Sequence, residues 1–285
     1  MANLKEIRNR IASVSSTMQI TSAMKLVSAA KLKKAQDAIT AMRPYSDKLT
    51  SLLQALSGSI EGSNAAVYAQ EREVEKVLVV SITSNRGLCG AFNTNIIKQS
   101  IRLASETYKG ASVDVVAVGK KANDLLSKQF NVVANHSDVY DDLTFDNVAD
   151  IADRLMGDFQ AGTYDKIVLV YNQFINAANQ RVMTEQFLPI VAAEATTQSA
   201  DYLFEPSKAE IVSELVPKAL KTQLYKAIRD SFASEHGARM TAMHKATDNA
   251  GELRDQLKLT YNKARQAAIT NEILEIVGGA EALSA

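Results

Sequence analysis

The chain has 285 residues, which suffices for one large or two modest domains, and 46% of them are hydrophobic, which suffices for a core. Its 32 Lys and Arg balance 32 Asp and Glu, and a single cysteine excludes an internal disulfide framework. No apolar run approaches the roughly 18 residues of a membrane-spanning helix, and charged residues interrupt the N-terminus where a signal peptide would be apolar.

Residues 1–57 predict one long helix, because they contain no glycine and only one proline. Apolar residues recur in them at alternating steps of three and four, the repeat that is typical of a left-handed coiled coil. The row consists of Leu4, Ile7, Ile11, Val14 and Met18, and it resumes as Leu32, Ala35, Ile39, Met42, Ser46, Leu49, Leu53 and Leu56. A helix of about 80 Å needs a partner of comparable length.

The row is polar at three positions between its two apolar stretches, where it reads Thr21, Lys25 and Ser28. One interpretation is a tolerated weak patch of coiled coil. The other is that this stretch, with Met24 and nearby lysines, faces an acidic partner. Residues 1–57 hold nine Lys and Arg against three Asp and Glu, a net charge of +6, which favours an acidic surface. Nucleic acid is disfavoured, because Tyr45 is the only aromatic residue before position 58.

After a polar linker at 58–73, the pattern changes to short β-branched runs that alternate with helical stretches. Such alternation is typical of a parallel sheet covered on both faces. The expected strands are 77–82, 113–118 and 167–171, with an edge strand at 182–191, and the expected helices lie near 91–109, 119–129 and 144–160. We therefore expect a Rossmann-like α/β domain over residues 74–195.

This domain shows no enzyme motif. The turn Gly87-Leu88-Cys89-Gly90 lies between a strand and a helix, but it lacks both the GxGxxG spacing and the lysine of GxxxxGK[ST]. Its glycines are interpreted as serving a tight turn. The three histidines, at 136, 236 and 244, are scattered, so Cys89 is interpreted as a buried structural thiol.

The chain ends in a second helical stretch, which we expect over 207–285. Ser207 and Glu210 form a capping-box pattern, and Pro217 suits the first turn of a second helix that reaches Val277. Its candidate seam is rich in small residues: Ala246, Ala250, Leu253, Leu257, Ala264, Ala267 and Ala268. The predicted fold is thus an α/β domain inserted between two long terminal helices that form an antiparallel coiled coil. Periodicity alone also allows two separate helical bundles.

Four blocks of the sequence resemble the γ subunit family of F-type ATP synthase. The last block fits the family pattern Ile/Val-Thr-x-Glu, two residues, an acidic residue, three residues, Gly-Ala. The residues in register with it are Ile269, Thr270, Glu272, Glu275, Gly279 and Ala280. The other blocks are 5–11 with 20–25, then 84–93, then 238–243 with 246–250. The blocks follow the family's order, and the resemblance covers the whole chain.

The resemblance implies a rotor shaft without catalytic residues or cofactor, which couples ion flow to ATP synthesis. The implied partners are a ring of three α and three β subunits, the ε subunit and the ring of c subunits in the membrane. The implied location is peripheral, on the cytoplasmic face of a bacterial inner membrane. Residues that the resemblance places in contact with the β subunits are Arg265, Gln266, Thr270, Glu272, Met24 and Lys25.

Cys89 stands alone, so the cysteine pair that acts as a redox switch in plant chloroplast members is absent. Two other protein classes remain as alternatives. One is a cytosolic coiled-coil scaffold or tether with an α/β cap, and the other is a nucleotide-dependent enzyme, which would need a phosphate loop. Co-purification with large nucleotide-binding partners would separate the three.

Overall fold

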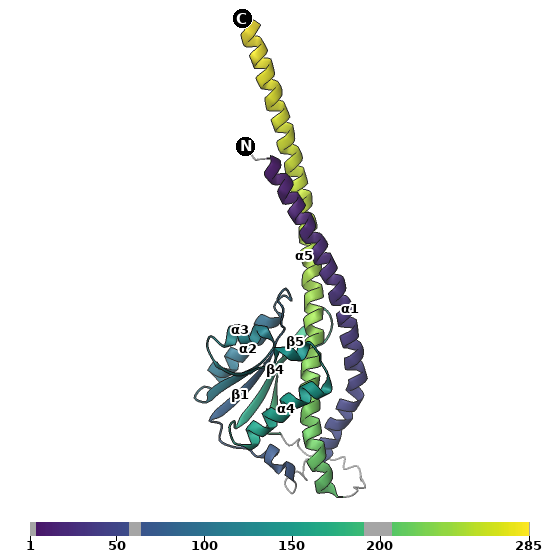
Figure 1. Cartoon of the computed structure of the whole chain (residues 1–285), viewed down its shortest axis with the longest axis vertical. Helices are drawn as coiled ribbons and strands as arrows, with labels where there is room; N and C mark the ends of the chain where they lie inside the picture. Colours follow the sequence, from purple (N-terminus) through teal and green to yellow (C-terminus); the bar gives the residue numbers. More distant parts are fainter. Residues whose placement is uncertain (1–3, 57–63, 191–206, 285) are drawn as a thin grey trace. The chain divides into compact units, whose positions relative to one another are not determined.

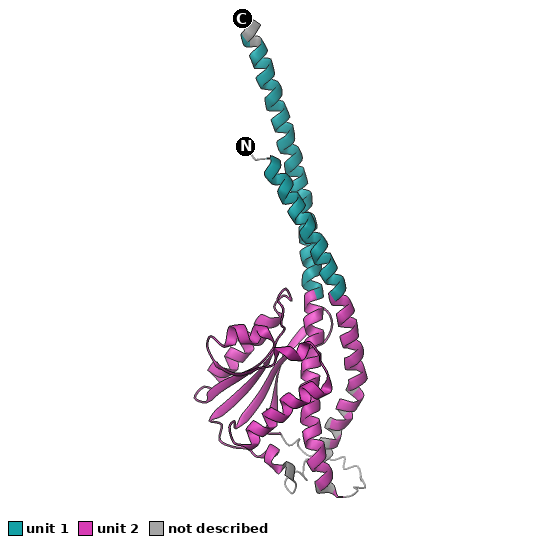
Figure 2. Ribbon diagram, viewed as in Figure 1, with its two compact units in different colours: residues 1–27, 240–285 teal, residues 28–239 magenta. Residues whose placement is uncertain are grey.

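The computed structural model describes residues 4–56, 64–190 and 207–284 (Figure 1). They form two compact units, one of residues 1–27 with 240–285 and the other of residues 28–239 (Figure 2). Two long terminal helices, α1 (Leu4–Leu56) and α5 (Lys208–Ser284), contribute to both units, and an α/β sheet lies between them in the sequence. The predicted fold class is confirmed. Within the described ranges, no helix is apolar over a stretch long enough to cross a membrane.

The larger unit contains a five-stranded sheet in the order β3-β2-β1-β4-β5. Its strands are β1 (Lys76–Ile82), β2 (Ser112–Val118), β3 (Asn131–Asn135), β4 (Lys166–Phe174) and β5 (Gln180–Leu188). The first four pair in parallel, and β5 runs antiparallel at the edge beside β4. Strands β1 and β4 are almost wholly buried, as expected of strands covered on both faces.

Helices cover both faces of this sheet (Figure 1). The helices α2 (Phe92–Arg102) and α3 (Lys120–Leu126) pack on one face. The other face packs against α4 (Phe145–Gln160) and the first third of α5. An apolar row of α5 belongs to the same hydrophobic core as this face of the sheet and α4. That row consists of Val212, Val216, Leu220, Leu224, Ala227 and Ile228. The first third of α5 is therefore core of the α/β layer, which its sequence did not suggest.

Three details of the prediction need correction. Strand β3 was not predicted, because it is a short edge strand with a polar residue at each end and no buried residue. The stretch expected as helix 91–109 leaves the α-helix after Arg102 and continues as the short π-helix η3 (Leu103–Thr107). Pro217 begins no second helix, since it lies inside α5. The Ser207 cap is confirmed, because its Oγ accepts a hydrogen bond from the Glu210 amide at 3.3 Å.

The predicted linker 58–73 is partly folded. Residues 58–63 lie outside the described ranges, and Asn64–Ala69 form the 3-10 helix η2. Tyr68 is buried, and its carbonyl accepts a hydrogen bond from the Ile190 amide. A second 3-10 helix, η4 (Ser137–Tyr140), follows β3. The division into parts 1–57, 74–195 and 207–285 stays a prediction.

The apolar row of α1 is confirmed where its side chains are described. Its buried members are Ile7, Leu32, Ala35, Ile39, Ser46 and Leu49, and the side chains of Leu53 and Leu56 lie outside the described set. The seam predicted for α5 needs correction in the smaller unit. Leu253 is 45% exposed, and Arg254 and Tyr261 take seam positions instead. The observed row, spaced by alternating steps of four and three, is Met243, Thr247, Ala250, Arg254, Leu257, Tyr261, Ala264 and Ala268.

Candidate functional site

In the smaller unit, α1 and α5 run antiparallel and are joined by polar contacts. Arg8 Nη2 donates to Tyr261 Oη at 2.8 Å, and the Thr21 and Thr247 hydroxyls lie 2.8 Å apart. Residue numbers rise along one helix as they fall along the other, so Leu4 lies level with about residue 264. Beyond that point, α5 has no described residue of α1 beside it.

The uncovered end of α5 carries the four C-terminal residues that the resemblance singled out. Arg265, Gln266, Thr270 and Glu272 are all exposed, and Thr270 Oγ1 donates to the Gln266 carbonyl at 2.9 Å. Arg265 makes no ion pair with any residue that the structure describes. Its guanidinium therefore remains available for a planar, bidentate contact.

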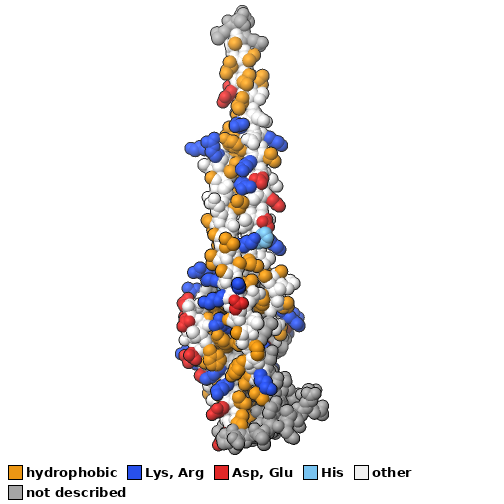
Figure 3. All heavy atoms as spheres, turned by 90° about the vertical axis from the view of Figure 1, so that its right-hand side faces the viewer, with side chains coloured by type: hydrophobic (Ala, Val, Ile, Leu, Met, Phe, Trp, Pro, Cys, Tyr) orange, Lys and Arg blue, Asp and Glu red, His pale blue; other side chains and the backbone are white. Residues whose placement is uncertain are grey.

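Large apolar side chains surround these polar ones on the same segment. They are Ile269, Ile273, Leu274, Ile276 and Val277, each about half exposed or more. In Figure 3, orange hydrophobic side chains are visible on the surface below the grey tip. So many exposed large apolar side chains on one segment are typical of a surface that another protein covers.

Met24 and Lys25 lie elsewhere in the same unit. Both are half-buried on α1, where they flank the buried seam residue Thr21. By the same antiparallel register they lie level with about residue 244, roughly 30 Å along α5 from Arg265. The six residues predicted from the resemblance therefore form two separate surfaces rather than one site.

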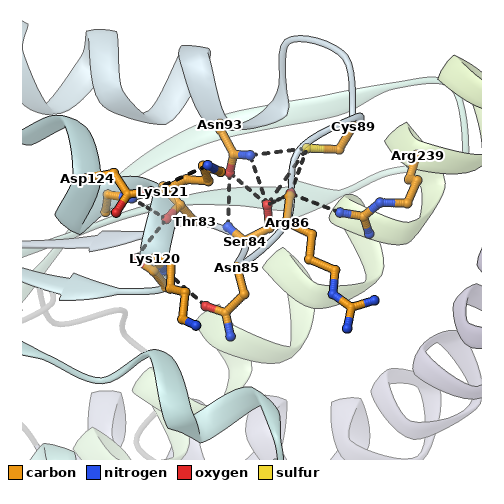
Figure 4. Close-up of polar contacts among 12 residues, drawn as sticks. Thr83, Ser84, Asn85, Arg86, Cys89, Asn93, Lys120, Lys121, Asp124 and Arg239 are labelled. Atoms are coloured by element: carbon orange, nitrogen blue, oxygen red, sulfur yellow. Dashed lines mark hydrogen bonds and ion pairs between the residues drawn. The ribbon is translucent and has the colours of Figure 1, made fainter.

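The glycine turn in the larger unit is held by side-chain hydrogen bonds (Figure 4). Asn93 donates to Ser84 Oγ at 2.8 Å and to Cys89 Sγ at 3.2 Å, which packs the turn against the start of α2. Leu88 and Gly90 have φ angles of 62° and 59°, and glycine adopts this left-handed conformation at least cost. These contacts support the prediction that the glycines serve a tight turn. Cys89 is buried, as predicted, and burial raises the pKa of its thiol.

Arg239 of α5 also contacts this turn, and Figure 4 shows its guanidinium beside the loop. Its Nη2 donates to the carbonyl oxygens of Arg86 and Gly87 at 3.1 and 3.3 Å, and its Nη1 donates to Glu235 Oε1 at 2.5 Å. Both ionic side chains are about nine-tenths buried. Burial raises the pKa of Glu235, although Arg239 acts in the opposite direction. The chain thus contains a buried ion pair that ties α5 to a loop of the α/β layer.

Comparisons with known proteins identify the family. A family model described as ATP synthase matches residues 3–283. The ATP synthase gamma chain of Flavobacterium psychrophilum is 70% identical over 285 residues, covering 99% of both chains. That of Cytophaga hutchinsonii is 51% identical, covering 100% of both. The chain belongs to the ATP synthase gamma chain family.

Solved structures agree with this fold. A chain from the central stalk and c-ring structure of Tetrahymena thermophila mitochondrial ATP synthase is 26% identical, with a TM-score of 0.60. The match covers 80% of this chain and 99% of that one. A chain of the Euglena gracilis mitochondrial ATP synthase superposes with a TM-score of 0.73 at 23% identity, covering 98% of this chain and 94% of that one. The second likeness shows the fold alone.

Sequence reasoning assigned no role to Arg239 in this gamma chain. Its block, 238–243, was recognised only as part of the resemblance. One signal could have found it, because Glu235 and Arg239 stand four residues apart on a predicted helix, the spacing of a helical ion pair. The burial of that pair could not have been found, since it depends on the turn at 86–87.

We expect this chain to give the assembled complex the same ATPase activity with and without a dithiol reductant. Cys89 is buried and its raised pKa leaves little thiolate to react. Activity is measured after oxidant, after oxidant plus reductant, and in the Cys89→Ser variant. A several-fold reductant effect that disappears in Cys89→Ser would show that Cys89 is a reactive thiol.

A second prediction concerns acid sensitivity. Burial, and next Arg239 and Lys31, lower the pKa of His236 from its ordinary 6.5 to about 3. The neutral form therefore contributes stability that is present above about pH 6.5 and is lost as the pH falls toward 3.

His236→Phe keeps a ring beside Phe232, which lies edge-to-face at 4.5 Å, but cannot titrate. We expect its helix content, followed by circular dichroism from pH 7 to 4, to persist to lower pH than that of the native chain. His244→Gln replaces an exposed histidine of the same helix and serves as the control. Equal acid midpoints for His236→Phe and the native chain would contradict the prediction.

Proposed function

We propose that this gamma chain is the central rotor of an F-type ATP synthase, which couples transmembrane ion flow to ATP synthesis. The observation that carries the proposal is the end of α5 beyond residue 264. It exposes five large apolar side chains and has no described segment of its own chain beside it. A segment of this kind suits a shaft enclosed by a ring of other subunits, here three α and three β subunits.

The remaining parts of the proposal follow from the family. The α/β unit contacts the ε subunit and the ring of c subunits, as suits a rotor whose neighbours include structures of central stalk with c-ring. The chain itself is not catalytic. It lies peripherally, on the cytoplasmic face of a bacterial inner membrane, as part of a membrane-bound complex.

Two surfaces of the chain contact the β subunits. The C-terminal surface consists of Arg265, Gln266, Thr270 and Glu272. The second surface consists of Met24 and Lys25, which contact the acidic loop at the base of β.

A rotation measurement tests this function. The complex is immobilised through its β subunits, and a bead is attached to a cysteine introduced at the exposed Lys109 of the α/β unit. We expect ATP to drive unidirectional rotation of the bead. A stationary bead on a complex that hydrolyses ATP would exclude the rotor role. Purification of the tagged chain without nucleotide-binding partners would favour the coiled-coil scaffold instead.

A further inference from the structure

The seam between α1 and α5 is polar at Thr21, and the structure shows how this polar position is satisfied. Thr21 is only 8% exposed. Its hydroxyl lies 2.8 Å from that of Thr247 across the seam, and Thr247 Oγ1 lies 2.8 Å from the Met243 carbonyl oxygen. The Thr21 hydroxyl is farther from its own helix, at 3.1 Å from the Met18 carbonyl.

These distances define one chain of hydrogen bonds. Each hydroxyl has one proton to donate. Both of the 2.8 Å contacts are hydrogen bonds when Thr21 donates to Thr247 and Thr247 donates to the Met243 carbonyl. A buried hydroxyl such as that of Thr21 costs stability unless it is hydrogen-bonded, so its bond to the half-buried Thr247 favours one arrangement of the two helices over others.

The hydrogen bond between Thr21 and Thr247 fixes the rotation of α1 about its own axis, because it requires Thr21 to face α5. Met24 and Lys25 follow Thr21 by three and four residues, so they lie on either side of the line along which Thr21 faces α5. Both are half-buried there, with one side toward the seam and the other toward solvent. A small rotation of α1 would bury one of them and expose the other.

We propose that Thr21 and Thr247 are positioning residues, whose hydrogen bond holds Met24 and Lys25 at the angle needed for coupling. The proposal rests on the proposed contact of those two residues with the β subunit. It also replaces the interpretation of this stretch as a weak patch, because the polar position is buried and paired across the seam.

Two substitutions separate the hydrogen bond from packing. Thr→Val keeps the shape and adds apolar character, whereas Thr→Ser keeps the hydroxyl and loses a methyl group. If packing alone matters, the Val variants should perform as well as the native chain or better. If the hydrogen bond positions α1, Thr21→Ser and Thr247→Ser should retain function, and Thr21→Val/Thr247→Val should lose it.

The first readout is the position of α1 in the full chain. Spin labels are placed at cysteines introduced at Ala23 and Lys245, which are exposed and lie level with each other. The native chain and the Ser variants should give one narrow distance. In the double Val variant, the population ratio of that position to all others should fall about fivefold, the usual effect of one neutral hydrogen bond. The native chain without introduced cysteines, labelled in parallel, gives the background from Cys89.

The second readout is the number of protons pumped per ATP hydrolysed by the assembled complex in membrane vesicles. We expect the double Val variant to pump less per ATP than the native complex. Thr17→Val and Thr260→Val are the matched controls, because the hydroxyls of these exposed threonines donate within their own helices, to the Ser13 and Gln256 carbonyls. Both controls should keep the native ratio.

A narrow native distance in the double Val variant would overturn the proposal, as would Ser variants that fail like the Val variants. A broadened distance with unchanged pumping would support the positioning of α1 and overturn the proposed contact of Met24 and Lys25.

Discussion

Replacing Arg265 and Gln266 by alanine is expected to give an assembled complex whose ATP synthesis and hydrolysis are both substantially reduced. The two side chains are exposed on the part of α5 that extends beyond the start of α1, where the chain supplies them with no described ionic partner. A charge-assisted contact from Arg265 to a β-subunit loop would contribute about 1.5–3 kcal/mol. Alanine is the best helix former, so α5 itself should remain folded.

Both activities are measured in membranes with equal amounts of assembled complex. The neighbouring double variant Asn262→Ala/Lys263→Ala is a matched control, because it also removes one amide and one positive charge from exposed positions of α5. It should keep near-native rates. Native rates in Arg265→Ala/Gln266→Ala would remove these residues from the coupling surface, and equal losses in both variants would indicate a general charge effect.

Periodicity predicted the elements whose burial is set by their own sequence. The apolar row of α1 and the β-branched runs of β1, β2 and β4 needed no knowledge of their neighbours, because a heptad or a buried strand is visible in a short window. The edge strand β3 was missed for the converse reason. It has five residues, with Asn at each end and no buried side chain, and only its pairing with β2 makes it a strand.

The seam of α5 shows a second limit. Small residues were expected in it, yet Arg254 and Tyr261 occupy two of its positions and Leu253 faces solvent. Arg254 Nη1 lies 3.9 Å from Met18 Sδ, and the Tyr261 hydroxyl accepts from Arg8. Long side chains of this kind bury their stems and keep their polar ends satisfied, so residue type alone misjudged the seam. The exposed end of α5 was recognisable only through the resemblance.

Arg239→Ala is expected to destabilise the chain by about 3–5 kcal/mol, because it leaves the Glu235 carboxylate buried without its cation. It also removes the donors to the carbonyl oxygens of Arg86 and Gly87, which hold the turn after β1. Lysine lacks the planar fork that spreads the donors of Arg239 over two nitrogens, so Arg239→Lys should be only partly stable. The free energy of unfolding is measured for the full chain by urea denaturation at pH 7.

The control is an ion pair with the same spacing but on the surface. Arg102 and Glu106 are four residues apart and 2.8 Å from each other, with about two-thirds of each side chain exposed. Arg102→Ala should therefore cost far less stability than Arg239→Ala. The double variant Glu235→Gln/Arg239→Met removes both buried charges and should recover much of the loss.

The pH dependence of the loss identifies its cause. Removing Arg239 takes away the group that most strongly opposes the effect of burial, ahead of Lys31 and Arg86, so the pKa of Glu235 in the folded variant should rise further above its ordinary 4.5. A carboxyl whose folded pKa is raised costs stability once it ionises, and that cost disappears as the pH falls through the raised pKa toward the unfolded value. The deficit of Arg239→Ala relative to the native chain should therefore shrink between pH 7 and about pH 5. A stability deficit that stays constant over this pH range would show that the loss comes from the turn contacts instead. A deficit no larger than that of Arg102→Ala would show that the buried pair contributes nothing to stability.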